Sequence, residues 1–174
     1  MNFLYHMVPD RIVGKELVTL EMIRQHDELY VHHTRKYKGR EHVMSHKIPP
    51  LNCTANQVLN FTAIHPKKVD RALKEAGFAE GLLKRKWFKI NPKLLNPDMA
   101  AVFLYRRDLP IEDAGNYKGY EIRELNSYNT LSKETIQYYK EKRTQGIRPL
   151  LFHLVPHILY KGTLKISDLE VIRI

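Results

Sequence analysis

A short apolar pattern with one histidine and a closing proline occurs near both ends of the chain. The first copy spans residues 3–9 (FLYHMVP) and the second spans residues 151–156 (LFHLVP). A short apolar run that is rich in aromatic residues and stops at a proline is typical of a buried strand. If both copies are strands of one sheet, the imidazoles of His6 and His153 can face a common cleft. The repeated pattern therefore predicts that the beginning and the end of the chain meet.

The clearest helix signal follows His65. This residue takes the capping position, Pro66 takes the first helical position, and Gly77 comes just past the end. The apolar residues between them recur at helical spacing and predict one buried face, formed by Val69, Ala72, Leu73 and Ala76. Capping residues predict three further helices, at 20–25 after Thr19, at 28–38 after Asp27, and from Ser132 to about 145.

Strand signals dominate the second half of the chain. Apolar and β-branched runs between turn residues predict strands at 56–62, 86–90, 99–105, 116–125, 150–155, 158–164 and 169–174. A length of 174 residues fits one domain, so we expect residues 1–174 to form a single domain. Helices concentrated in the first half and strands in the second predict an α+β fold with a mixed or antiparallel sheet.

The charge balance indicates an affinity for anions. Lys and Arg total 29 against 19 Asp and Glu, which gives a formal net charge of +10. Such an excess attracts phosphates, nucleic acids or acidic substrates. The basic residues are spread along the chain, which favours a generally positive surface. Aromatic residues also alternate with basic ones at 138–140 and 84–88, as they do in surfaces that stack nucleic-acid bases, so nucleic acid stays a candidate partner.

Several functional classes are not indicated by the sequence. It has no glycine-rich GxGxxG motif and no zinc-type spacing, because Cys53 is the sole cysteine, so we expect no metal. The pair His42 and His46 has a ligand-like spacing that nine histidines can produce by chance. No apolar run approaches the roughly 20 residues of a membrane span, so we expect no membrane partner. The lone cysteine and the lack of a secretory signal predict a cytoplasmic protein.

Both ends of the chain resemble one known group. Residues 5–9 (YHMVP) are similar to the opening of the small DUF952 proteins, which belong to the wider ADP-ribosyltransferase-like fold. Residues 155–160 (VPHILY), with Lys161, Gly162 and the stretch 164–171, are similar to the closing segment of the same group. The resemblance implies a bent, split sheet with flanking helices that clasps the nicotinamide of NAD. The middle of the chain does not take part in it.

The resemblance also implies roles for particular residues. His6 would bond the nicotinamide ribose, and Asn60 and Thr62 would line the second strand of the cleft. Asn60 stands where the group carries a histidine, which favours a relative without catalytic activity. A carboxylate is needed to stabilise the oxocarbenium-like ribosyl group; Glu170 is the first candidate and Glu124 the second.

Other residues would complete a nucleotide site. An aromatic ring, Tyr30 or Tyr37, would stack on nicotinamide, and a guanidinium, Arg24 or Arg35, would hold the pyrophosphate. His153 would contribute from the far end of the chain.

Three hypotheses stay open from the sequence. The first is a domain that binds NAD or a related nucleotide and transfers ADP-ribose. The second is a nucleic-acid-binding module that uses the basic surface. The third is an inactive or interaction protein with the same fold.

Overall fold

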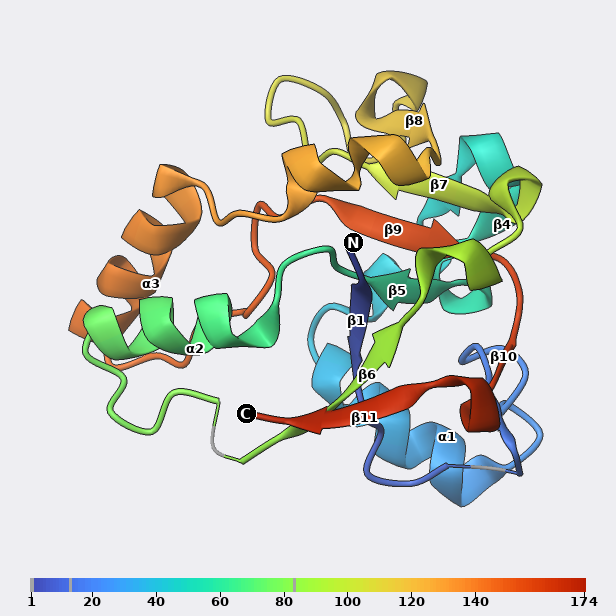
Figure 1. Ribbon diagram of the computed structural model, residues 1–174, viewed down its shortest axis with the longest axis horizontal. Coiled ribbons are helices and arrows are strands. Elements are labelled where there is room, and N and C mark those ends of the chain that lie inside the picture. The colour runs from blue at the N-terminus through green and yellow to red at the C-terminus, as the bar shows by residue number, and fades with distance from the viewer. Residues whose placement is uncertain (1, 13, 83) are drawn as a thin grey trace.

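The computed structural model describes residues 2–12, 14–82 and 84–174, and two antiparallel sheets organise them (Figure 1). The first has three strands in the order β1-β6-β11: β1 (Leu4–Met7), β6 (Lys86–Ile90) and β11 (Glu170–Arg173). The second has four strands in the order β5-β9-β7-β8: β5 (Leu59–Phe61), β9 (His157–Tyr160), β7 (Ala100–Phe103) and β8 (Tyr117–Gly119). Each sheet thus combines segments from early and late in the chain.

One backbone pair joins the two sheets. Tyr5 N donates to Thr62 O at 2.8 Å, and Thr62 N donates to Tyr5 O at 3.1 Å. No other ladder connects β1 to β5 in the described chain, and β1 runs across the direction of β9 in Figure 1. We call this junction between β1 and β5 the split. It brings the strand that carries His6 directly beside the four-stranded sheet.

Smaller elements surround these sheets. Two-residue strands pair as β2 (Glu16–Leu17) with β10 (Leu164–Lys165), and as β3 (Lys47–Ile48) with β4 (Cys53–Thr54). The helices are α1 (Asp27–Thr34), α2 (Pro66–Glu75) and α3 (Lys133–Thr144). Short 3₁₀ segments follow α1 at Arg35–Tyr37 (η1) and β8 at Ile122–Tyr128 (η8). The fold is therefore α+β, as predicted, and every strand pairing among the described residues is antiparallel.

Local signals account for α2 and α3. The His65 ring nitrogen accepts from Lys67 N at 3.1 Å, which caps α2. Ser132 Oγ accepts from Thr135 N at 3.1 Å and caps α3 in the same way. The predicted apolar face of α2 is buried and packs with Tyr139 of α3, beside which α2 lies in Figure 1. Both helix predictions are confirmed.

Large apolar side chains fill the space on both sides of the sheets. The main core contains Leu4, Phe61, Phe88, Val102 and Ile158 from five strands. A second core, between the three-stranded sheet, α2 and α3, contains Trp87, which is 1% exposed. The Trp87 indole nitrogen has no hydrogen-bond partner among the described residues, and the Phe152 ring stands perpendicular to the indole at 5.9 Å. Residues 84–88 thus supply core side chains at Trp87 and Phe88 rather than a base-stacking surface.

Two predicted elements are wrong. Residues 150–155 form a turn instead of a strand, and Leu154 has a left-handed backbone with φ of 58°. A strand cannot pass through that conformation, so the predicted pairing of two similar strands does not exist. Residues 20–25 are turns and not a helix after Thr19, because their few apolar residues offer no continuous face to a core.

Other predictions need their boundaries moved. Helix α1 begins after His26 and not after Asp27, and it ends at Thr34. The predicted strand 99–105 stops at Phe103, since Tyr105 has a φ of 62° that no strand accepts. The predicted strand 116–125 is only three residues long before η8 begins. In the part of the chain described, no helix has the length and apolar character needed to cross a membrane.

Candidate functional site

His6 is the predicted site residue that the structure places most clearly. It lies in β1 at the split and is half-buried, with its ring edge-on to Phe61 at 5.7 Å. Its Nδ1 lies 2.8 Å from the Asn60 carbonyl oxygen. A carbonyl only accepts, so Nδ1 carries the proton and Nε2 is left as an acceptor. Nε2 has no hydrogen-bond partner among the described residues and is not fully buried, so it stays available to a ligand.

The electrostatics of the split keep this imidazole neutral. Burial lowers the pKa of His6 to about 4, against the opposing effect of its bond to Asn60, and the positive charge of Lys36 lowers it further. The ring is therefore uncharged near pH 7, and it can accept a hydrogen bond from a hydroxyl group.

A basic turn lies near His6 and was not predicted as a unit. It consists of Lys36, Tyr37 and Arg40, where η1 ends. Lys36 Nζ lies 5.2 Å and Arg40 Cζ 5.5 Å from the Tyr37 ring centroid. Arg40 Nη2 also donates to Lys36 O at 3.1 Å. Desolvation and the charge of Arg40 lower the pKa of Lys36, although its side chain as a whole is exposed. The sequence signal was the alternation of basic residues around Tyr37 at 35–40.

Asn60 and Thr62 have structural roles in the split. The Asn60 side chain is exposed, and it is the backbone carbonyl that holds His6. Thr62 is 3% exposed, and its Oγ1 accepts from Ile64 N at 3.1 Å. The structure therefore brings both residues to His6, but through the backbone of β5 and not through side chains that line a cleft.

The two candidate carboxylates do not join His6. Glu170 pairs in register with Lys89, whereas His6 pairs with the next residue, Phe88. Neighbouring residues of a strand point to opposite faces, so Glu170 and His6 lie on opposite sides of the three-stranded sheet. Glu170 Oε2 instead accepts from Lys89 Nζ at 2.7 Å. Glu124 accepts from Lys118 of β8 at 2.8 Å, at the edge strand farthest from the split.

Tyr30 and Arg24 are the predicted nicotinamide-stacking ring and pyrophosphate ligand. Tyr30 is half-buried in α1, where its carbonyl accepts from Thr34 Oγ1 at 2.8 Å. The Arg24 side chain is 68% exposed and pairs with Glu21 at 3.6 Å. Neither has a hydrogen bond or ring contact with His6 in the described ranges.

His153 belongs to a turn and to a different cluster. Its ring stacks on Tyr138 with centroids 4.1 Å apart, and its Nδ1 lies 3.5 Å from the Tyr105 hydroxyl. Strand β9 carries His157 instead, whose Nδ1 lies 2.7 Å from the Val155 carbonyl. In β9, His157 points to the face opposite Ile158 and therefore away from the core on which His6 packs. Neither His153 nor His157 therefore faces a common cleft with His6, and the prediction of two histidines in one cleft is wrong.

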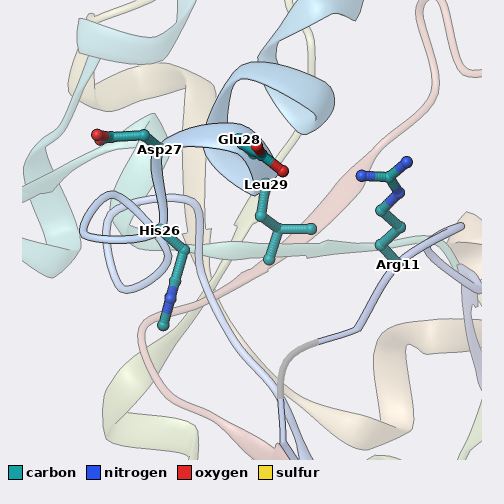
Figure 2. A pocket seen from close by; sticks show the side chains of 5 residues that line it. All are labelled: Arg11, His26, Asp27, Glu28 and Leu29. Carbon is teal, nitrogen blue, oxygen red and sulfur yellow. The ribbon is translucent and has the colours of Figure 1, made fainter.

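A surface hollow of about 380 Å³ lies at the start of α1, lined by Arg11, His26, Asp27, Glu28 and Leu29. Figure 2 shows Arg11 facing Glu28 and Leu29, while Asp27 and His26 point elsewhere. His6 is not among the lining residues, so this hollow is distinct from the split.

Nowhere in ranges 2–12, 14–82 and 84–174 do three histidine, cysteine or acidic side chains gather as metal ligands would.

Comparisons with protein family models, with characterised proteins and with solved structures found no match to this chain.

Proposed function

We propose that this protein binds NAD or a related nucleotide at the split. The observation that carries the proposal is the neutral, half-buried imidazole of His6, whose Nδ1 is fixed by Asn60 O at 2.8 Å and whose Nε2 is unused in the described chain. A ring held in this way presents one acceptor in a defined direction. A ribose hydroxyl is a donor of matching chemistry.

The basic turn supplies the complementary charge. Lys36 acts on His6 through its charge, and Arg40 acts on Lys36 in the same way, so Lys36 lies within electrostatic range of the split and Arg40 lies next to Lys36. A pyrophosphate placed there would relieve the repulsion between the two cations. The planar guanidinium of Arg40 suits two phosphate oxygens at once.

The sequence resemblance to ADP-ribosyltransferase-like proteins also supports the proposal. The resemblance at residues 5–9 implies a first strand that carries a ribose-binding histidine beside a split sheet. Here β1 carries His6, and the two antiparallel sheets meet at that strand. We restrict the proposal to binding, because Glu170 lies on the opposite face and pairs with Lys89. Binding without ADP-ribosyl transfer is thus the function that the site supports best.

Ligand-induced thermal stabilisation tests the proposal. At ten times its Kd, a ligand that binds only the folded state adds about 1.4 kcal/mol and raises Tm by about 3–6 °C. We expect this shift with NAD and with ADP-ribose, and a smaller one with nicotinamide alone. His6→Gln and Arg40→Ala are expected to abolish it, whereas Arg24→Ala, which removes an exposed guanidinium that pairs with Glu21, retains it. Equal shifts in wild type and His6→Gln, or no shift at millimolar NAD, would contradict nucleotide binding at this place.

A further inference from the structure

Five half-buried rings form a row across the four-stranded sheet and α3. The row runs from Tyr117 of β8 through Phe103 of β7, Tyr105 and His153 to Tyr138 of α3. Successive ring centroids lie 5.3, 5.3, 5.7 and 4.1 Å apart. Each ring is thus in contact with the next while keeping part of its surface in solvent. We call this set the ring row.

Cations flank the ring row. Lys142 Nζ lies 5.7 Å from the Tyr138 ring centroid. The positive charges of Arg107 and Lys142 lower the pKa of His153. The positive charges of Arg107 and Arg40 act on the Tyr105 hydroxyl in the direction that lowers its pKa. Burial is the larger influence on both rings: it lowers the pKa of His153, which favours the neutral imidazole, and it raises the pKa of the Tyr105 hydroxyl.

Acidic groups also lie near the row. At its β8 end, burial raises the pKa of the Tyr117 hydroxyl, and the negative charge of Glu112 raises it further. Hydrogen bonds from its own backbone N–H and from Ser132 lower the pKa of Glu134, and the charge of Arg107 lowers it further, which places this carboxylate within reach of the same cation. The carboxylate of Asp108 is occupied by Arg106 Nη2 at 2.7 Å. The balance is therefore positive around Tyr105, His153 and Tyr138, in line with the net charge of +10 for the whole chain.

We propose that the ring row binds single-stranded nucleic acid, with bases stacked on the half-buried rings and phosphates next to Arg40, Arg107 and Lys142. Bases of any sequence have faces that stack on aromatic rings, and a basic border holds the backbone. A duplex hides its base faces and would leave the rings unused. This inference does not depend on nucleotide binding at the split, although the charge of Arg40 acts both on Lys36 and on Tyr105.

The row is held in place before any ligand arrives. The Tyr138 hydroxyl accepts from Leu150 N at 3.1 Å, and the Tyr117 hydroxyl donates to Lys47 O at 3.3 Å. Tyr105 is presented by a left-handed backbone with φ of 62°, a conformation that costs a tyrosine free energy. Rings fixed in this way lose little conformational entropy when bases stack on them, which favours binding.

Filter binding with oligonucleotides of about 12 nucleotides, a length within the usual site size, tests the inference. We expect oligo(U) and oligo(dT) to bind and a duplex of equal length to bind more weakly. Three phosphate contacts predict a slope of log K against log salt of about −2. Preference for RNA over DNA would indicate contacts to the 2′-hydroxyl, and equal binding would indicate stacking and phosphate contacts alone.

Variants give the decisive comparison. Tyr105→Ala is expected to weaken binding about tenfold by removing one stacking ring. Arg107→Ala, a change at an exposed position that leaves the fold intact, is expected to weaken binding and to make the salt slope less steep by about 0.7. Glu134→Gln removes the nearby negative charge and is expected to strengthen binding. Arg173→Ala, which removes one positive charge from β11, serves as the matched control.

The outcomes separate the two proposed sites. His6→Gln should lose the NAD shift and keep oligonucleotide binding, whereas Tyr105→Ala should show the reverse. Circular dichroism melts identify any variant that has failed to fold. If Tyr105→Ala does not fold, the comparison of Arg107→Ala with wild type decides whether the ring row is the binding site. If Arg107→Ala and Arg173→Ala weaken binding equally, the interaction is a general effect of net charge and the ring row is not its site. Undetectable binding at low salt would overturn the inference as well.

Discussion

The two copies of the apolar His-x-Val-Pro pattern fold differently, although their residues match position by position. In the first copy, residues 4–7 form a strand with β6 on one side and the Thr62 pair on the other. In residues 151–156 the pattern is a turn whose carbonyls are bonded by α3: the Leu151 carbonyl accepts from Tyr139, and the His153 carbonyl from Thr135 at 3.0 Å. The pattern therefore specifies burial, and the available hydrogen-bond partners specify the backbone conformation.

The largest difference between the two copies is expected in how much Leu4 and Leu151, which occupy the same position in the pattern, contribute to the free energy of unfolding. Leu4 is 0% exposed in the main core, whereas Leu151 is only half-buried in the turn. Leu4→Ala should lower the free energy of unfolding by about 2–5 kcal/mol, since it leaves a cavity between the sheets. Leu151→Ala should cost about 1 kcal/mol, because its surroundings can collapse. Urea unfolding of both variants measures the contrast, and equal costs would show that the two copies are packed alike.

The matched histidines are expected to differ in their effect on acid stability. The folded-state pKa of His6 is lowered to about 4 from an ordinary 6.5, so the unfolded chain binds its proton first as pH falls. Stability from this group is complete above pH 6.5 and declines as pH falls toward 4, by at most about 3 kcal/mol.

Urea unfolding between pH 7.5 and 4 gives the size of this effect. His6→Gln should show a shallower loss than wild type. The pKa of His153 is also lowered, by burial and by the charges of Arg107 and Lys142, but its ring touches other half-buried rings at the surface. His153→Gln should therefore resemble wild type more closely. Identical acid profiles for wild type and His6→Gln would mean that the imidazole at the split is solvated.

The hydrogen bond from Tyr139 tests what keeps the second copy in a turn. Tyr139 is 0% exposed, and its hydroxyl donates to the Leu151 carbonyl. Tyr139→Phe leaves that carbonyl without its partner and should cost about 1–3 kcal/mol. Tyr138→Phe, at a half-buried ring, should cost less. Amide hydrogen exchange should show the loss of protection concentrated at residues 150–155, and uniform loss across both sheets would argue against a local role.

The smallest expected effect is that of a glycine substitution on stability, and it has opposite signs in the two copies. Met7 ends a strand, whereas Leu154 occupies the matching position with φ of 58°. Glycine adopts that left-handed conformation without the cost of about 1–2 kcal/mol that other residues carry, so Leu154→Gly should be neutral or stabilising once its lost contacts are included. Met7→Gly should destabilise by about 0.5–1 kcal/mol. Thermal melts of the two variants decide the signs, and destabilisation in both would contradict a special backbone at Leu154.

Much of the fold could be predicted wherever a signal is local. Helix α2 follows from His65 and Pro66, α3 follows from Ser132, and β6 matches its predicted bounds. The two-residue strands β2, β3, β4 and β10 were missed, because so few residues leave no periodic pattern and exist only through their partners.

The candidate site was predictable to a smaller extent. His6 could be singled out because a histidine within an apolar strand is unusual. The face on which Glu170 lies could not, since a shift of one residue in strand register moves a side chain to the opposite side. The proximity of Lys36 to His6 also depends on how η1 is placed relative to β1, which no local pattern indicates.

The perpendicular contact between Trp87 and Phe152 gives the protein an intrinsic optical probe. Trp87 is the only tryptophan, and it lies where the three-stranded sheet meets the turn at residues 151–156. Its indole is in apolar surroundings, so the native emission should be blue-shifted, and water entering this contact should shift the maximum to the red. A change in fluorescence that precedes the loss of circular dichroism during denaturation would therefore report that the turn detaches before the sheets unfold.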